Sequence, residues 1–404
     1  AVWGAYLTSM GRYLGTAGFG SEIGNFYAMQ GLVSLFMPAL MGIVADRWIP
    51  AQRLLGGCHM LAGMLMLGVF LYTQTDAPSY PSLFALYSLS VAFYMPTLAL
   101  SNSVAYTSLD QAGLDLVKSF PPIRVFGTVG FICTMIAVSL LGLEATSGQF
   151  AVSAIISLVL AVYAQTLPNC PTAPKGQSKS LVEALGLRAF VLFKQRKMAL
   201  FFIFSMLLGV SLQITNGFAN PFISTFGEIP AYADTFGVKY ANILISLSQL
   251  SETLCILLIP FALRRFGIRR VMLIAMVAWV LRFALLGLGN PGSGVWLFLL
   301  SMIVYGVAFD FFNVSGSLFV DKETDPSIRS SAQGLFMIMT NGIGATLGSL
   351  GAQAVINRFV YSQSEATAIL SGWTTSWYIF AGYAAVVAVL FALLFRYNTA
   401  TEAK

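Results

Sequence analysis

The sequence predicts an all-α membrane protein with twelve transmembrane helices in two six-helix bundles. Of its 404 residues, 57% are hydrophobic and only 9% are charged, whereas a soluble domain carries about 25% charged residues. The apolar residues also gather in long runs, most of them near the roughly 20 residues that a helix needs to cross a bilayer. A soluble core does not absorb that much apolar surface, so the composition excludes a soluble enzyme.

The apolar runs set the expected order of the helices. Their approximate limits are 1–16, 23–45, 52–73, 82–106, 121–143, 148–166, 197–222, 237–262, 269–289, 294–319, 328–354 and 372–395. The first run is shorter than all the others because the sequence begins inside it, so we expect that helix to be incomplete.

The widest interval between runs, residues 167–196, separates two groups of six. It holds three prolines and five basic residues, which is typical of a polar linker. We therefore expect an N-terminal bundle at 1–166, a C-terminal bundle at 197–395 and a tail at 396–404. Within the linker, residues 181–193 are predicted to form a short helix at the membrane surface.

Basic residues mark one side of the predicted membrane domain. The junctions after even-numbered runs and the linker hold most of them: Arg47, Arg53, Lys118, Lys175, Lys179, Arg188, Lys194, Arg196, Arg264, Arg265, Arg269, Arg270 and Lys322. The opposite junctions hold little beyond Lys239 and Arg358. Since cytoplasmic loops carry the excess of Lys and Arg, this asymmetry places both termini and the linker in the cytoplasm.

Four ionisable residues stand out inside or at the start of apolar runs: Arg124, Glu252, Arg282 and Asp310. An ionisable group in hydrocarbon costs at least about 2.5–3.5 kcal/mol, so it is retained where it pairs or works. Arg124, Thr128 and Phe131 share one helical face, which suits a cavity wall. Arg282 has no polar neighbour at helical spacing and is predicted to pair with an acid on another helix.

Two pairs of polar residues recur at helical spacing. Gln213 and Asn216 lie three residues apart on one face, as do Gln249 and Glu252. The amide pair fits a polar ligand and interhelical hydrogen bonding equally well. Glu252, deep in an apolar helix, favours its neutral form, which suits a proton carrier. A structural ion pair with Arg124 or Arg282 is the alternative.

The tenth run carries a polar stripe beside an aromatic one. Asp310, Asn313 and Ser317 follow helical spacing, and Tyr305 and Phe309 adjoin them. Rings beside a carboxyl and an amide suit a flat polar molecule. Aromatic packing accounts for the phenylalanines equally well, but not for Asp310.

No catalytic, nucleotide-binding or metal-binding motif appears, so neither an enzyme nor a cofactor is expected. The four cysteines lack metal-ligand spacing. The single histidine, His59, is expected to be a hydrogen-bonded packing residue. Gly344 and Gly348, four residues apart, predict a close helix–helix contact.

Several unbroken strings carry a family resemblance. They are 120–124 (FPPIR), 212–216 (LQITN), 248–254 (SQLSETL) and 305–316 (YGVAFDFFNVSG), and the Gly-x-x-x-Asp-Arg loop string at 42–47 accompanies them. The chain resembles the nucleoside:proton symporter family of the major facilitator superfamily over nearly its whole length. The resemblance implies that substrate-binding residues match Arg124, Thr128, Phe131, Gln213, Asn216, Gln249, Glu252, Tyr305, Phe309 and Asp310.

The resemblance also implies a function: alternating access in a bacterial inner membrane, importing nucleosides such as uridine or adenosine with protons. Asp310 and Glu252 are the candidates for proton coupling. The expected partners are the substrate, protons and the lipid bilayer, with no nucleic acid, and the expected state is a monomer. Two alternatives stay open on the residues alone: a carrier for another polar solute such as a sugar, and a receptor related to transporters.

Overall fold

The computed structural model describes residues 1–172, 187–325 and 328–397, and all regular structure among them is helical. The N-terminal half contains η1 (Trp3–Ala5), α1 (Met10–Thr16), η2 (Gly20–Glu22), α2 (Ile23–Ser34), α3 (Met37–Arg47), α4 (Ala51–Tyr72), α5 (Tyr80–Gln111), α6 (Leu116–Leu140) and α7 (Gly148–Ala164). The C-terminal half contains η3 (Leu187–Lys194), α9 (Arg196–Thr225), η4 (Phe226–Glu228), α10 (Phe236–Lys239), α11 (Ala241–Leu288), α12 (Val295–Glu323), α13 (Arg329–Met337), η5 (Ile338–Gly344), α14 (Ala345–Phe359) and α15 (Ala366–Leu394).

Nine helices in the described residues are long and apolar enough to cross a membrane. The twelve predicted runs map onto them once three features are counted. The 48-residue α11 contains two runs, because its backbone leaves helical geometry at Gly267. The 17-residue α7 is a shorter apolar helix, and residues 1–16 fold as η1 and α1 instead of one regular helix. The prediction of an all-α membrane protein is confirmed.

The break in α11 follows from its sequence. Gly267 has φ 74°, a left-handed conformation that only glycine adopts without strain. Arg269, just after this turn, donates from Nε to the Phe395 carbonyl at 2.6 Å and from Nη2 to the Ala392 carbonyl at 2.7 Å. These carbonyls close α15, where a cation is favoured by the helix dipole. The basic turn therefore also caps the last helix.

Replacing Arg269 is expected to destabilise the C-terminal half. Arg269→Ala leaves the two α15 carbonyls without their donor, at a cost of about 1–3 kcal/mol. We expect a melting temperature several degrees lower in detergent, measured by scanning fluorimetry. Arg270→Ala is the matched control, since Arg270 is exposed on the same turn. Equal melting temperatures for the two variants would contradict the capping role.

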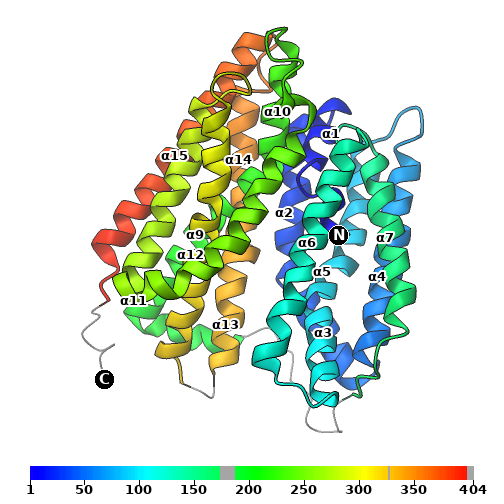
Figure 1. Ribbon diagram of the computed structural model, residues 1–404, viewed down its shortest axis with the longest axis vertical. Coiled ribbons are helices and arrows are strands. Elements are labelled where there is room, and N and C mark those ends of the chain that lie inside the picture. The colour runs from blue at the N-terminus through cyan, green and yellow to red at the C-terminus, as the bar shows by residue number, and fades with distance from the viewer. Residues whose placement is uncertain (173–186, 326–327, 398–404) are drawn as a thin grey trace.

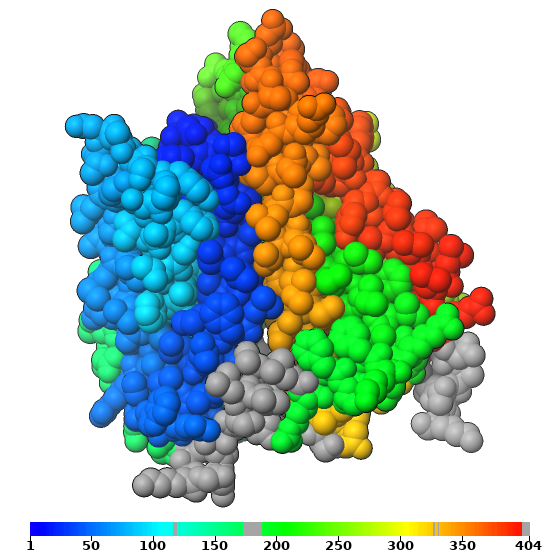
Figure 2. Space-filling view, turned by 180° about the vertical axis from the view of Figure 1, so that it is seen from behind, coloured from blue at the N-terminus to red at the C-terminus, as the bar shows by residue number. Residues whose placement is uncertain are grey.

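The two halves of the chain lie side by side (Figure 1), with helices coloured blue to teal on one side and green to red on the other. Between the halves, α2 packs against α14 and η5, α6 against α11, and α1 against α9. Figure 2 shows the first of these contacts from behind, where the blue and orange segments meet. We call the end that holds α10 and the α6–α7 loop the upper end; α3 and α13 mark the lower end (Figure 1).

Glycines let the halves approach closely. A Cβ at Gly11 of α1 would collide with the backbone of Gly217 in α9, and one at Gly24 of α2 would lie 2.5 Å from the Ser349 carbonyl of α14. Small residues allow such approach in membranes, where helix association depends on close packing. The halves therefore approach each other to backbone contact at both of these helix pairs.

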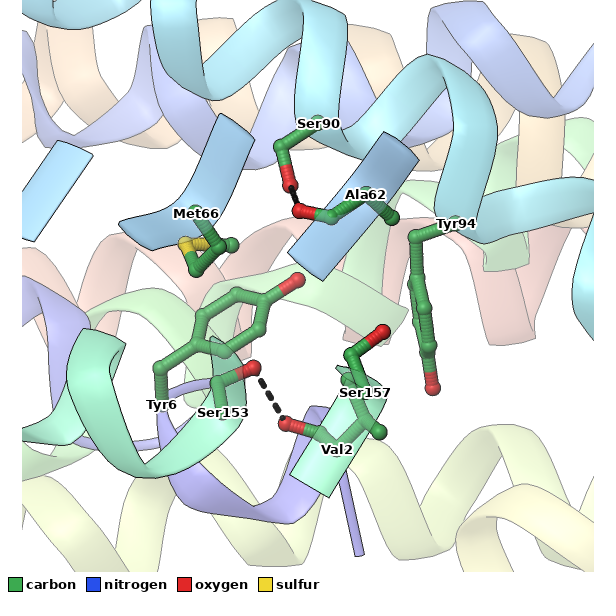
Figure 3. A pocket seen from close by; sticks show the side chains of 8 residues that line it. All are labelled: Val2, Tyr6, Ala62, Met66, Ser90, Tyr94, Ser153 and Ser157. Atoms are coloured by element: carbon green, nitrogen blue, oxygen red, sulfur yellow. Dashed lines mark hydrogen bonds between the residues drawn. The ribbon is translucent and has the colours of Figure 1, made fainter. Parts of the chain in front are cut away.

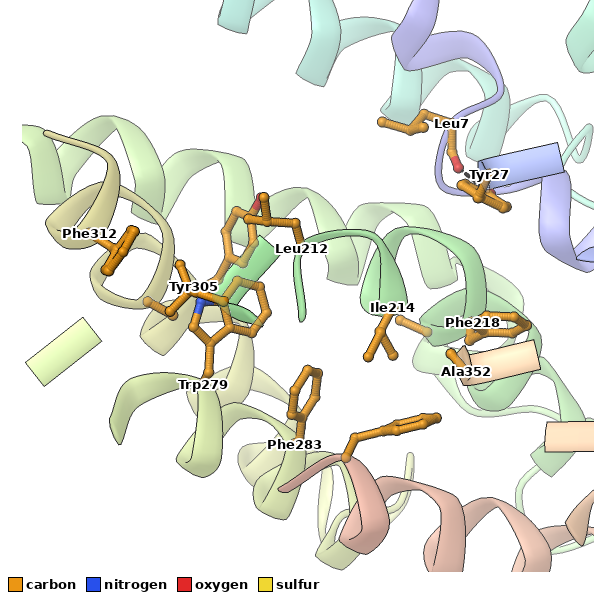
Figure 4. Close-up of a cluster of buried hydrophobic side chains, with 14 of the residues drawn as sticks. Leu7, Tyr27, Leu212, Ile214, Phe218, Trp279, Phe283, Tyr305, Phe312 and Ala352 are labelled. Atoms are coloured by element: carbon orange, nitrogen blue, oxygen red, sulfur yellow. Dashed lines mark hydrogen bonds between the residues drawn. The ribbon is translucent and has the colours of Figure 1, made fainter. Parts of the chain in front are cut away.

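Within the C-terminal half, the predicted glycine contact is confirmed. A Cβ at Gly344 or Gly348 would collide with the α9 backbone at Met206 and Val210. The preceding segment, Ile338–Gly344, is π-helical. Aromatic side chains fill much of the remaining core, including Trp279, Phe283, Tyr305 and Phe312 (Figure 4). This rigid packing positions the polar residues described next.

Candidate functional site

Tyr305 of α12 lies at the centre of a packed group of side chains. Its ring stacks on Phe309 at 5.6 Å between centroids and meets the edge of Trp279 at 5.9 Å. The Arg282 guanidinium lies over the Tyr305 ring, 4.5 Å from its centroid, a cation–π geometry. The side chain of Gln249 lies close to the Tyr305 hydroxyl. The predicted aromatic stripe of Tyr305 and Phe309 is therefore an ordered wall, in which these contacts hold the Tyr305 ring in place.

Arg282 differs from its prediction. It is buried and donates to the Ser301 carbonyl at 2.8 Å and to Ser248 Oγ at 3.4 Å. Among the described residues, its partners are these groups, Met302 Sδ and the Tyr305 ring, and no carboxylate forms an ion pair with it. The prediction of an acidic partner is wrong: a carbonyl, a hydroxyl and a ring face surround the cation, and its Nε is buried without a hydrogen-bond partner among the described residues.

Two carboxyl groups lie beside this wall. Asp310 is 5% exposed, and its Oδ2 is buried without a hydrogen-bond partner among the described residues. Glu252, one turn after Gln249 on α11, lies within electrostatic range of Asp310. A buried carboxylate oxygen without a partner is unfavourable while it is charged. The rest of the predicted stripe is engaged elsewhere: Asn313 donates to the Phe309 carbonyl at 3.0 Å and Ser317 to Gln333 at 3.1 Å.

The N-terminal half contributes a cation. Arg124 is exposed on α6, the helix that packs against α11, and lies within electrostatic range of Glu252. Thr128 and Phe131, further along α6, are half-buried. Neither the Arg124–Asp310 pair nor the Arg124–Glu252 pair is formed as a salt bridge among the described residues. The structure thus brings Arg124 of α6 near Glu252 of α11 between the halves, and Asp310 of α12 lies on the other side, near Glu252.

Gln213 and Asn216 form a hydrogen-bonded pair on α9. Asn216 Nδ2 donates to Gln213 Oε1 at 2.8 Å, and Gln213 Nε2 donates to Gln30 Oε1 of α2 at 3.4 Å. Gln30 Nε2 in turn donates to the Tyr87 hydroxyl at 2.7 Å. The amide pair therefore does form interhelical hydrogen bonds, while the half-buried Asn216 still reaches accessible space. Sequence reasoning missed Gln30 and Tyr87, which share no helix with the pair.

A second buried polar cluster lies at the upper end. Glu144, 3% exposed, accepts from Arg12 Nη1 at 3.3 Å, Asn220 Nδ2 at 2.9 Å and the Asn242 backbone N–H at 3.1 Å. Ser139 also donates to it. Asn220 and Asn242 belong to the C-terminal half and the others to the N-terminal half. Arg12 therefore forms an ion pair inside the protein.

The remaining polar features are structural. A small cavity with room for about one water molecule lies in the N-terminal half, lined by residues that include Tyr6, Ser90 and Tyr94 (Figure 3). No predicted substrate residue lines it. His59 Nδ1 lies 3.1 Å from Ser157 Oγ, which confirms it as a hydrogen-bonded packing residue. The described residues contain no group of three or more His, Cys, Asp or Glu side chains able to hold a metal ion.

Spanning helices that bring acids, amides and rings together between two halves define a polytopic membrane transporter. The chain matches the family model described as "Nucleoside H+ symporter" over residues 1–400. It therefore belongs to the nucleoside H+ symporter family.

Comparison with individual relatives supports the same family assignment. The chain is 49% identical over 400 residues to the xanthosine permease of Escherichia coli (strain K12) and 47% identical to the nucleoside permease NupG of the same strain; both alignments cover 98% of this chain and 93% of the relative. A crystal structure of the nucleoside transporter NupG gives a TM-score of 0.89 at 46% identity, covering 98% of this chain and 96% of that one. An auto-inhibited POT family peptide transporter, at 15% identity and TM-score 0.64, shares the fold alone.

Proposed function

We propose that this chain imports nucleosides together with protons across the bacterial inner membrane by alternating access. Family membership supports both the substrate class and the coupling ion. The moving units are two six-helix bundles, residues 1–166 and 197–395, joined by the linker at 167–196. The upper end faces outward, and the linker and both termini are cytoplasmic, which the distribution of Lys and Arg supports. The protein works as a monomer.

One observation carries the site assignment: Arg124 of α6 meets Glu252 of α11 between the halves, and the buried acid and aromatic rings of α12 lie next to α11. Substrate would contact the following residues: Arg124, Thr128, Phe131, Gln213, Asn216, Gln249, Glu252, Tyr305, Phe309 and Asp310. Because Arg282 already covers the Tyr305 ring, we assign apolar contact with the base to Phe309 and Phe131. The Tyr305 hydroxyl, the amides and the acids remain for hydrogen bonds.

Asp310 is the proposed proton carrier. Its Oδ2 is buried without a hydrogen-bond partner among the described residues, so a negative charge on this carboxyl is unfavourable. Proton binding removes that charge and its desolvation cost. The arginines are poor carriers, because guanidinium stays protonated. Glu252, close to both Arg124 and Asp310, tunes that proton or binds the ribose.

Uptake in proteoliposomes tests the function. Purified protein should accumulate radiolabelled uridine when the lumen is made alkaline relative to the outside, and only equilibrate it when the gradient is collapsed by a protonophore. A hexose at the same concentration should neither accumulate nor compete. Hexose accumulation without uridine uptake would favour the alternative of a sugar carrier, and unchanged uridine accumulation with the protonophore would exclude proton coupling.

Gln249 provides a test of recognition. Removing its amide in Gln249→Ala leaves a polar group of the bound nucleoside unpaired, which costs about 1–3 kcal/mol. Uridine binding measured by calorimetry should therefore weaken at least several-fold. Gln363→Ala, in an exposed loop at the upper end, is the matched control and should bind as the unmodified protein does. An unchanged affinity in folded Gln249→Ala would remove Gln249 from the site.

A further inference from the structure

Gln30 of α2 is a buried amide whose two ends are both engaged. It is 2% exposed, its Nε2 donates to the Tyr87 hydroxyl at 2.7 Å, and its Oε1 accepts from Gln213 Nε2 at 3.4 Å. Tyr87 is fixed in turn: it is 1% exposed, and its ring packs 5.0 Å from Phe26 and 6.2 Å from Tyr6. The hydroxyl that anchors Gln30 therefore has a set position.

The amides of Gln30, Gln213 and Asn216 all point the same way. Asn216 donates to Gln213, Gln213 to Gln30, and Gln30 to Tyr87. A side-chain amide can turn over and exchange its donor and acceptor ends. Turning one amide alone would bring two N–H groups or two carbonyls face to face, so the three amides keep one common direction, and in this structure Gln30 Nε2 donates to the Tyr87 hydroxyl. We call these four residues the amide relay.

The free end of the amide relay is the carbonyl oxygen of Asn216. Gln30, Gln213 and Tyr87 are all buried, whereas Asn216 is half-buried. In this direction the accessible end of the relay presents Asn216 Oδ1 as its unused acceptor, beside the second N–H of Asn216 Nδ2. An acceptor in this position selects a ligand group that donates, such as a ribose hydroxyl or an imide N–H of a pyrimidine base.

We propose that Gln30, held by Tyr87, is a positioning residue that fixes the Asn216 amide with its oxygen toward the substrate, and so makes the site selective for a hydrogen-bond donor on the nucleoside. This inference rests on the proposed function. Neither Gln30 nor Tyr87 touches the substrate; they act through Gln213 and Asn216. Since the relay joins α2 and α5 to α9, the N-terminal half sets the polarity of a binding group on the C-terminal half.

The test compares ligands across variants. Uridine, 2′-deoxyuridine, 3′-deoxyuridine and N3-methyluridine are titrated by calorimetry into the purified full chain. Each of the three analogues lacks a different donor. The analogue that lacks the donor paired with Asn216 should bind the unmodified protein about five- to tenfold more weakly than uridine does. In Gln30→Leu, uridine should weaken by a similar factor while that analogue changes less than about twofold, because the lost partner was already absent. The discrimination between the two ligands should therefore collapse.

Two further variants separate positioning from packing. Tyr87→Phe keeps the ring contacts and removes the hydroxyl, so it should reduce the same discrimination even if Gln30→Leu fails to fold. Ser90 lies on the same helix as Tyr87, and Ser90→Ala removes its buried 2.8 Å hydrogen bond to the Ala62 carbonyl of α4. This variant should leave the ligand ratios unchanged. Adding Gln30→Leu to Asn216→Ala should cause no further loss of uridine affinity.

Ligand ratios that stay constant in folded Gln30→Leu and Tyr87→Phe, with all affinities shifted together or unchanged, would overturn the inference and leave the relay a packing feature. Unmodified protein that binds none of the four nucleosides would instead overturn the proposed function. The two failures are thus distinguishable within one set of titrations.

Discussion

Proteoliposomes that contain Asp310→Asn should equilibrate uridine but not accumulate it against its gradient. Asparagine keeps the shape of the side chain and removes its titration. Asp310 is the acid whose Oδ2 is buried without a partner, so the unmodified carboxyl gains most from binding a proton. Without that group, an imposed pH gradient has no site through which to act, so uptake should stop at equilibrium, as it does for the unmodified protein treated with a protonophore.

Exchange of labelled for unlabelled uridine separates coupling from binding in this variant. Exchange requires substrate binding and reorientation but no net proton movement, so a measurable fraction should remain in Asp310→Asn. Asp321→Asn is the matched control, because Asp321 lies on the same helix but pairs with Arg329 at 3.2 Å. Full gradient-driven accumulation by Asp310→Asn would move the assignment to Glu252, and Glu252→Gln would then be the variant that loses it.

Features confined to one helix were predictable from the sequence. Helical spacing groups Gln213 with Asn216 and Gln249 with Glu252, and an isolated acid such as Asp310 stands out in an apolar run. The break between the eighth and ninth runs was also visible, because a basic turn with a glycine interrupts the hydropathy. Each of these signals needs only the geometry of a helix.

Features made between helices were not predictable in the same way. Arg282 was expected to pair with an acid, but it donates to the Ser301 carbonyl of α12 and lies over the Tyr305 ring. In the sequence, nothing distinguishes Gln30 and Tyr87 from other residues of apolar helices, because their link to Gln213 forms only when α2, α5 and α9 pack together. The linker helix predicted at 181–193 is only partly testable: residues 181–186 lie outside the described residues, and Leu187–Lys194 forms a 3-10 helix.

The Glu144 cluster is the clearest example, and it bears directly on alternating access. It joins α1 and the α6–α7 loop to α9 and α11 at the upper end, where sequence separations reach 234 residues between Thr8 and Asn242. Arg12 also donates to the Val238 carbonyl at 3.2 Å, and Thr8 to Asn242 Oδ1 at 2.9 Å. These bonds cross between the halves, so they stabilise a conformation that is closed at the upper end and must break when that end opens.

Glu144→Gln should therefore shift the protein toward opening at the upper end. The carboxylate accepts from Asn220 at Oε2 and from the Asn242 backbone at Oε1 across the interface, and an amide would present N–H groups to one of these two donors. Each hydrogen bond to a charged group contributes about 1.5–3 kcal/mol, and Arg12 also loses its counter-ion. A loss of about 3 kcal/mol corresponds to more than a hundredfold change in the equilibrium between the two conformations.

Spin labels at Thr146 and Ala231 measure this shift, since both residues are exposed at the upper end and they belong to opposite halves. With the four native cysteines replaced by serine, the unmodified interface should give one short distance by pulsed electron resonance. Glu144→Gln should add a longer distance that becomes the main population. Glu22→Gln is the matched control: Glu22 is also at the upper end, but its carboxylate accepts from Asn25 of its own half, so its distance should not change. A single short distance in Glu144→Gln would mean that glycine contacts such as Gly11 on Gly217, and not this cluster, hold the upper end closed.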